Sequence, residues 1–272
     1  MLSWLVGAVG GREAVRLLAD PDAARAFLRR DLPLWAWPLC TLGAREWPYV
    51  RLWVEDADRA GEAPTAGLWV FDHPAWGGGV QAFGEVAALA GMLRGAVLPG
   101  RAFVRILTSA RELLTARYRF DWLEPIVRMH VTPETLRQPP EDRLVEPLGQ
   151  ADASALAALY AIWPESRFQP SRLRQGYRYV GIRDGHKMVA VAEQVLGADG
   201  LAVVQGVLVD PAWRGRGLAG AVTAALTARL FADGARDVVL DVRDSNLPAL
   251  VAYDRIGYRR HVTLLAGPGA AR

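Results

Sequence analysis

Cysteine is almost absent from this 272-residue chain, in which Cys40 stands alone. A single cysteine cannot form a disulfide within the chain, so packing and hydrogen bonds have to hold the fold. The four histidines are scattered along the sequence, and no spacing typical of metal ligands occurs, so no metal site is expected. We therefore expect a protein of the reducing cytoplasm that uses no metal.

Long apolar runs and strong charge bias are also missing. Although 51% of the residues are hydrophobic, no run approaches the roughly 18 apolar residues of a membrane-spanning helix. Residues 1–10 are apolar but carry no basic residue, and charges begin at Arg12, so no signal peptide is expected. The net charge is only +3 and the arginines are dispersed, so neither a membrane nor a nucleic acid is an expected partner.

The Gly-Lys-Ser/Thr motif of nucleoside triphosphatases is absent too, since Lys187 is the only lysine. Residues 207–220 nevertheless show a phosphate-binding pattern, in which an apolar strand leads through a glycine-rich turn into a helix. The N–H groups of a first helical turn lack partners and lie at the positive end of the helix dipole, so they can bind an anion. The candidate residues are Val207, Leu208, Val209, Arg214, Gly215, Arg216, Gly217, Leu218, Ala219 and Gly220. An ordinary connection between a strand and a helix is the alternative interpretation.

A second pattern follows this loop. Residues 238–242 predict a buried strand, and a helix with Asn246 at its start continues through Tyr253 to Gly257. Arg214-x-x-Gly217-x-Ala219 resembles the Arg/Gln-x-x-Gly-x-Gly/Ala signature of the GNAT superfamily of acyl-CoA-dependent N-acetyltransferases. The stretch from Asn246 to Tyr258 resembles the second signature of that family.

The resemblance covers roughly residues 141 to 265 and implies acetyl-CoA as cosubstrate. In the family the glycine loop cradles the coenzyme A pyrophosphate, and the preceding strand, here residues 207–209, aligns the pantetheine through its backbone. Asn246 is expected to anchor its helix or to contact the cofactor. The implied fold is α/β (α+β), with mixed twisted sheets flanked by helices.

The length predicts two domains. Two prolines and a charge cluster at residues 137–143 place the boundary between residues 1–140 and 141–272. In the second domain we expect strands over 179–183, 188–195 and 201–209, and a helix capped by Asp152.

The first domain predicts a helix over 13–30 and strands over 50–54 and 67–71. The strand-helix-strand-helix-strand order of residues 80–131 matches that of residues 201–265, which suggests a degenerate internal repeat. No Arg-x-x-Gly-x-Ala pattern follows Gly79, so one coenzyme A per chain is expected. Two-repeat proteins resembling glycine N-acyltransferases have this tandem layout. In those proteins the first repeat helps to shape the acceptor site. In this chain we expect most tryptophans of the first domain to pack in the core.

Acyl transfer to an amine needs a proton acceptor and a proton donor. Tyr253 occupies the place of the family's tyrosine near the coenzyme A sulfur and is the candidate general acid, with a packing role as the alternative. Gln205 stands where some relatives carry a catalytic glutamate, and an amide cannot act as a base. Glu193 on the neighbouring strand is the first substitute, and an ordered water is equally open.

These residues predict an N-acyltransferase that moves an acetyl (acyl) group from acetyl-CoA to a primary amine of a small molecule or peptide. Arg167 or Arg172 can bind a carboxylate of the acceptor, although solvated surface arginines are the default. The alternative function is a non-catalytic acyl-CoA sensor or interaction protein. The acceptor and the acyl-chain length are left open, as is the choice between monomer and homodimer.

Overall fold

The computed structural model describes residues 15–55, 66–137, 144–163 and 168–272. The chain forms two compact units, and each unit takes segments from distant parts of the sequence. Unit 1 comprises Met1–Arg30, Thr41–Glu124 and Leu264–Arg272, and unit 2 comprises Asp31–Cys40 and Pro125–Thr263. The predicted boundary between residues 140 and 141 lies outside the described residues.

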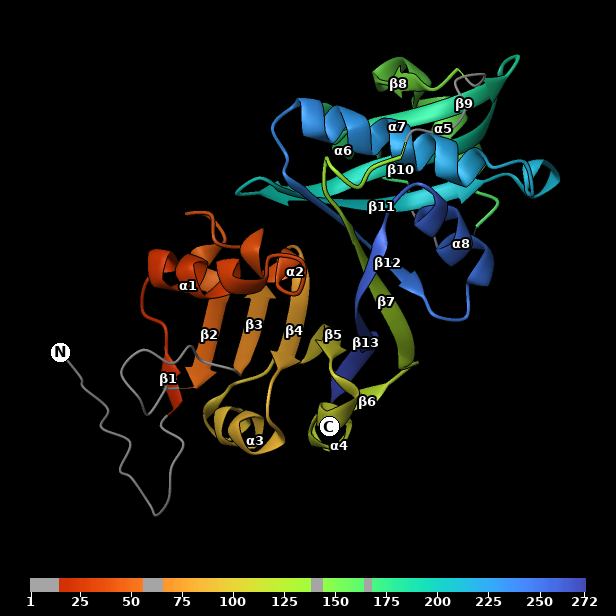
Figure 1. Cartoon of the computed structure of the whole chain (residues 1–272). Helices are drawn as coiled ribbons and strands as arrows, with labels where there is room; N and C mark the ends of the chain where they lie inside the picture. Colours follow the sequence, from red (N-terminus) through yellow and green to blue (C-terminus); the bar gives the residue numbers. More distant parts are fainter. Residues whose placement is uncertain (1–14, 56–65, 138–143, 164–167) are drawn as a thin grey trace. The chain divides into compact units, whose positions relative to one another are not determined.

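Unit 1 is built on a mixed sheet with the strand order β1-β2-β3-β4-β5-β13. Neighbouring strands are antiparallel except β4 and β5, which are parallel, and β6 also pairs with β13. The elements are β1 (Val15–Leu17), α1 (Pro21–Leu28), β2 (Val50–Glu55), β3 (Gly67–His73), β4 (Gly77–Phe83), α3 (Val86–Gly95), β5 (Arg101–Ile106), α4 (Arg111–Thr115), β6 (Tyr118–Phe120) and the part of β13 (Arg259–Ala271) that begins at Leu264. Figure 1 shows β2, β3 and β4 side by side between α1 and α3.

Two predictions for unit 1 are wrong in part. In the described part of the expected helix 13–30, β1 pairs with β2 and the helix begins only at Pro21. Asp20 precedes a proline, which disfavours helical backbone, and its side chain accepts from the N–H groups of Asp22 and Ala23 as the helix cap. The last strand of the expected strand-helix-strand-helix-strand order over residues 80–131 is two strands, because β6 ends at Phe120 and β7 begins at Glu124.

Unit 2 carries a second mixed sheet with the strand order β7-β12-β11-β10-β9-β8. Only β11 and β12 are parallel among these pairs of described strands. The elements are α2 (Ala36–Leu39), β7 (Glu124–Val131), β8 (Glu146–Leu148), α5 (Ala153–Tyr160), α6 (Pro170–Arg174), β9 (Tyr179–Asp184), β10 (Lys187–Ala198), β11 (Leu201–Val209), α7 (Leu218–Ala232), β12 (Asp237–Arg243) and α8 (Leu247–Arg255). Short 3₁₀ helices are η1 (Arg29–Asp31), η2 (Trp47–Tyr49), η3 (Thr108–Ala110), η4 (Gln150–Asp152) and η5 (Pro211–Trp213).

Helices cover both faces of the unit 2 sheet. Successive residues of a strand point to opposite faces, and on β10 Ala190 and Ala192 pack into the core that α7 and α8 share, whereas Val191 packs with α5. Figure 1 shows α7 lying along β10 and β11. The expected α/β fold of mixed sheets flanked by helices is thereby confirmed.

Asp152 does not cap α5 as predicted. Its carboxylate accepts from the backbone N–H of Gly149 at 2.7 Å and pairs with Arg183, while α5 has no side-chain cap. The 3₁₀ turn η4 moves the start of the regular helix one residue past Asp152, so the carboxylate points back toward the chain that enters the turn.

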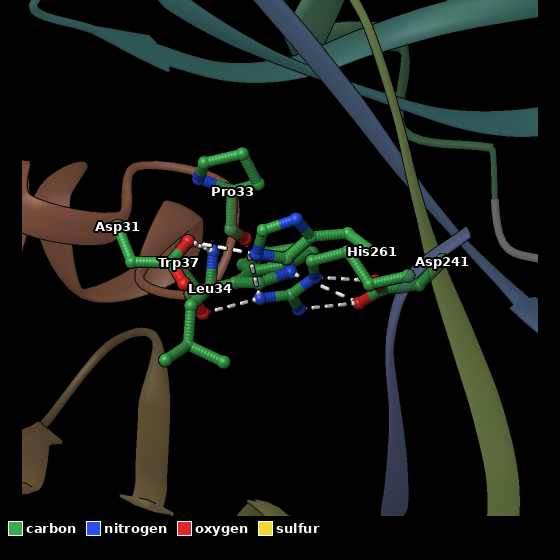
Figure 2. A network of polar contacts seen from close by, with 7 residues as sticks. Asp31, Pro33, Leu34, Trp37, Asp241 and His261 are labelled. Carbon is green, nitrogen blue, oxygen red and sulfur yellow. Dashed lines mark hydrogen bonds and ion pairs between the residues drawn. The ribbon is translucent and has the colours of Figure 1, made fainter. Parts of the chain in front are cut away.

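The segment Asp31–Cys40 is held in unit 2 by Arg128 of β7, whose side chain is 0% exposed. The guanidinium donates to both carboxylate oxygens of Asp241, at 2.7 and 2.8 Å, and to the carbonyl oxygens of Pro33 and Leu34. Figure 2 shows these contacts together with the 2.8 Å pair between His261 and Asp31. A buried guanidinium is tolerated when its charge is compensated and its N–H groups have acceptors, as here.

Within the part of the chain that the structure describes, no helix is both long and apolar enough to cross a membrane.

Candidate functional site

The parallel strands β11 and β12 stop pairing before either strand ends. Their ladder joins residues 201–204 to residues 237–240, whereas β11 continues to Val209 and β12 to Arg243. Over these last residues β11 stays paired with β10, and β12 stays paired with β7. The backbone groups of residues 205–209 that face away from β10 therefore have no partner on β12 and can bind an extended ligand.

A β-bulge at Gly206 coincides with this separation. Between the pairs Val191–Leu208 and Glu193–Gln205, β11 has two residues where β10 has one. Gly206 has a φ of +60°, the left-handed conformation that glycine adopts without strain. A bulge of this kind bends its strand and increases its twist. The bulge thus accounts for the direction in which β11 leaves β12.

Two polar side chains lie directly against the bulge. A β-carbon added to Gly206 would lie 2.7 Å from the Tyr160 hydroxyl oxygen and 2.8 Å from Glu193 Cγ. Glu193 is only 4% exposed, and Arg172 Nη1 donates to its Oε1 at 3.0 Å. The arginine compensates the charge of the buried carboxylate. The candidate base therefore lies beside the bulge within an ion pair.

Two tyrosine hydroxyls lie close to the Glu193 carboxylate. They belong to Tyr160 on α5 and Tyr179 on β9, both of which are buried. Burial raises the pKa of Tyr160 well above its ordinary value, and the Glu193 carboxylate raises it further. The same two causes raise the pKa of Tyr179. Both tyrosines thus stay protonated beside the Glu193 carboxylate. Sequence reasoning did not identify either as a site residue, because each lies among apolar residues in the sequence.

The loop that follows β11 is anchored by Asp210. This carboxylate is buried, accepts from the N–H of Ala212 at 2.9 Å and pairs with Lys187 Nζ at 2.6 Å. The hydrogen bond from Lys187, followed by that from Ala212, lowers the pKa of Asp210. Gly215 and Gly217 then have φ values of +74° and +75°, so the backbone itself requires glycine at both positions.

The N-terminus of α7 is open for an anion. Gly217 is the helix cap and supplies no side-chain hydrogen bond, and the first described intrahelical bond runs from the N–H of Ala221 to the Gly217 carbonyl. The preceding N–H groups therefore lack helical partners. Arg214 lies 4.6 Å above the Trp163 ring and Arg216 lies 4.5 Å above the Trp213 ring, so indoles hold both exposed cations near the loop.

Helix α8 packs against this end of α7. A β-carbon at Gly220 would lie 3.6 Å from Ile256 Cγ2 and 3.8 Å from the Ala252 carbonyl oxygen, so glycine allows the two helices to approach closely. Asn246 caps α8, because its side-chain oxygen accepts from the Ala249 N–H at 3.3 Å. Its amide nitrogen is not used by this cap.

Tyr253 and Tyr258 differ in how their hydroxyl groups are bonded. Thr227 donates to the Thr223 carbonyl, so the Tyr258 hydroxyl, 2.7 Å from Thr227 Oγ1, has to donate its proton to that oxygen. No described residue hydrogen-bonds to the Tyr253 hydroxyl, and burial raises the pKa of Tyr253 above its ordinary value. Tyr253 is thus a protonated group with a free O–H, whereas Tyr258 is structural.

The described strands of unit 1 show no corresponding separation. The parallel ladder between β4 and β5 joins residues 78–82 to residues 102–106 and so reaches the end of β5. Only Gly84 and Glu85 lie between β4 and α3, and Glu85 supplies no side-chain cap. The connection is too short for a loop like that of residues 210–217.

The remaining candidate residues are placed as follows. Arg167 lies outside the described residues, whereas Arg172 on α6 contacts Glu193. Gly206 was not predicted as a site residue, although a glycine inside a strand is a known signal for a bulge. Among the described residues, no group of three or more histidine, cysteine, aspartate or glutamate side chains is placed to hold a metal ion.

Comparison with known proteins identifies the fold. Residues 179–265 match the family model described as FR47-like protein. No curated protein matches the chain. A GNAT-family protein from Novosphingobium aromaticivorans is similar in structure, with 23% identity, a TM-score of 0.56, and 88% of this chain and 97% of that chain covered.

Two further structures are similar over nearly the whole chain. A GCN5-related N-acetyltransferase from Sphaerobacter thermophilus has 18% identity and a TM-score of 0.56, with 96% of each chain covered. A tandem GNAT protein from the clavulanic acid biosynthesis pathway has 12% identity and a TM-score of 0.51, with 95% of this chain and 98% of that chain covered. At these identities the likeness establishes the fold, and the chain has the GNAT fold.

We predict that Gly206→Ala costs more stability than Gly215→Ala. At both positions a β-carbon enters a left-handed backbone, which costs about 1–2 kcal/mol. At Gly206 it also meets Tyr160 and Glu193, whereas nothing lies within 4 Å of Gly215. Urea unfolding of both variants measures the difference. Equal losses of unfolding free energy would contradict the packing described around the bulge.

Proposed function

We propose that unit 2 binds acetyl-CoA and transfers its acetyl group to a primary amine of a small molecule or peptide. The observation that carries this proposal is the separation of β11 from β12 after Val204, in the strand that leads into a glycine loop and an open helix N-terminus. The free edge of β11 suits an extended chain with amide groups, and the glycine loop with the N-terminus of α7 suits a diphosphate. Coenzyme A contains both, in that order.

The backbone of Val207, Leu208 and Val209 would pair with the pantetheine arm, as a missing strand would. The diphosphate would accept hydrogen bonds from the N–H groups of residues 217–220, with Arg214 and Arg216 adding positive charge. The donor is proposed to be acetyl-CoA because this is the cosubstrate that the loop and the Asn246–Tyr258 pattern imply.

In the proposed reaction the nitrogen of a neutral amine attacks the thioester carbonyl carbon. The new C–N bond forms as the C–S bond breaks, the amine loses one proton, and the thiolate of coenzyme A takes one up. A backbone N–H at the bulge can stabilise the carbonyl oxygen as it becomes negative, because it is fixed in place before the reaction.

Tyr253 is proposed to give the proton to the thiolate. An ordinary tyrosine donating to a thiolate is uphill by roughly 2 kcal/mol, from pKa values of about 10 and 8.5. Burial raises the pKa of Tyr253 further, but the same burial disfavours the thiolate and raises the pKa of its thiol. The proton transfer is therefore less uphill than the tyrosine alone suggests.

Glu193 is proposed to accept the proton from the amine, directly or through a water molecule. Its position beside Gly206 supports this role, and the ion pair with Arg172 constrains it. An acceptor that carries its own carboxylate would compete for Arg172 and release Glu193. Asn246, besides capping α8, can offer its amide nitrogen to the cofactor.

We also infer that unit 1 is a degenerate copy of the same fold. The directions of three consecutive strand pairings support it, since β3-β4-β5-β13 and β10-β11-β12-β7 both run antiparallel, parallel, antiparallel. The proposed boundary between the copies in sequence is at residues 140/141, and each unit takes its last strand from the other half of the sequence, since β7 lies in unit 2 and the end of β13 lies in unit 1. Because its β4–β5 ladder is complete, unit 1 is expected to bind no coenzyme A.

A non-catalytic acyl-CoA sensor is the second candidate. The engagement of Glu193 by Arg172 favours it, and the free hydroxyl of Tyr253 favours the enzyme. Calorimetric titration with acetyl-CoA, followed by a thiol-release screen over amino acids, polyamines and peptides, separates the two, since a sensor binds without releasing thiol.

We predict that Ala219→Glu weakens binding of both acetyl-CoA and coenzyme A by at least about tenfold, or 1.4 kcal/mol. A carboxylate in the first turn of α7 stabilises the helix dipole, so the protein stays folded, but it repels the diphosphate. Isothermal titration calorimetry measures the affinity, with thermal unfolding measured alongside.

The matched control is Ala232→Glu, which places the same carboxylate at the exposed last turn of the same helix. Its affinity for both ligands should stay within about twofold of that of the unmodified protein, or roughly 0.4 kcal/mol. Equal affinities for the two variants would remove the α7 N-terminus from the binding site.

We predict that Tyr253→Phe lowers kcat by about 10²-fold while the affinity for coenzyme A changes little, because only the proton donor is lost. Steady-state thiol release at saturating amine measures kcat. Tyr258→Phe serves as the comparison, since that hydroxyl is committed to Thr227 and affects stability instead. Full turnover by Tyr253→Phe would assign the tyrosine a packing role.

A further inference from the structure

The segment Asp31–Cys40 comes from the first half of the sequence and lies in unit 2, where it reaches the separated strands. Trp37 Nε1 donates to Asp241 Oδ2 at 3.3 Å, and α2 contacts β11. Asp241 directly follows Leu240, the last residue of β12 that pairs with β11. Trp37 therefore lies at the inner end of the separation, where the two strands begin to diverge.

Strand alternation defines the face on which Trp37 lies. Val238, Leu240 and Val242 of β12 pack into the core shared with α7 and α8, so Asp241 points to the opposite face. Figure 2 shows the side chain of Asp241 directed toward the segment that carries Pro33, Leu34 and Trp37. Trp37 thus stands across the sheet from α7.

The segment is rigidly held at this position. Arg128, which is 0% exposed, makes a two-pronged contact with Asp241 and donates to the carbonyls of Pro33 and Leu34. Ala36 and Leu39 of α2 are 0% and 1% exposed, whereas Trp37 between them is only partly buried. A fixed backbone thus carries an indole with part of its surface uncovered.

We propose that Trp37 is the end wall of the acyl pocket and restricts the donor to short acyl groups. This inference rests on the proposed function. Pantetheine paired with residues 207–209 places the thioester beside Gln205 and Gly206. An acyl chain that continues in the same direction reaches the position of Asp241 and Trp37, because Val204 and Leu240 are the last paired residues. A two-carbon group ends before the indole, and an eight-carbon chain meets it.

Calorimetry with coenzyme A, acetyl-CoA and octanoyl-CoA tests this wall without an acceptor. The unmodified protein is expected to bind octanoyl-CoA at least about tenfold more weakly than acetyl-CoA. Trp37→Ala should bring octanoyl-CoA to within about threefold of acetyl-CoA. Trp37→Phe, which keeps a ring but loses the bond to Asp241, should retain the preference for acetyl-CoA.

Coenzyme A is the internal control, since it has no acyl group and its affinity should be the same for all variants. If Trp37→Ala loses coenzyme A as well, Trp37→Leu replaces it as the variant that keeps the core filled. The inference is overturned if the unmodified protein binds octanoyl-CoA as well as acetyl-CoA, or if shortening Trp37 leaves their ratio unchanged. Failure of the unmodified protein to bind any of the three ligands would instead overturn the proposed function.

Discussion

The separation of β11 from β12 is the constraint on which the rest of unit 2 depends. Backbone N–H and C=O groups inside a protein need partners, and a parallel sheet normally supplies them along the whole strand. Here the ladder ends at Val204, and the bulge at Gly206 turns β11 away. The sheet thus lacks hydrogen bonds between β11 and β12 beyond Val204, where an extended ligand can supply them instead.

Fixed charges and dipoles lie at both ends of the separated part of β11, residues 205–209. At one end, Asp210 and Lys187 hold the loop that leads to the open N-terminus of α7, and indoles support the two arginines. At the other, the ion pair of the buried Arg128 with the partly buried Asp241 ties Asp31–Cys40 to β7 and β12. A buried ion pair is a costly way to hold a segment, because desolvation offsets much of its attraction. It does fix the position of that segment, which is what a pocket wall requires.

The sequence predicted those helices and strands that begin or end at a cap or turn residue adjacent to them in the chain. The strands expected over 179–183 and 188–195 are β9 and β10, the glycine-rich turn leads into α7 as expected, and Asn246 caps α8. The loop glycines were identified because their spacing is characteristic. Each of these features depends on residues within one turn or one strand.

Features that depend on distant residues were missed. Arg128 and Asp241 are 113 residues apart, so no pattern in either neighbourhood reveals their contact. For the same reason residues 15–17 seemed to continue a helix, although pairing with β2 makes them a strand. The cluster of Tyr160, Tyr179 and Glu193 comes from three elements, and each residue alone fits an ordinary core.

The central claim is that the free edge of β11 is the binding site and that unit 1 has no equivalent. Amide hydrogen exchange with and without acetyl-CoA tests it most directly, because it reports on individual backbone N–H groups. We predict that the ligand slows exchange over residues 205–209 and 217–220, and leaves residues 77–95 of unit 1 unchanged. Protection confined to unit 1, or none over residues 205–209 at saturating ligand, would contradict this account.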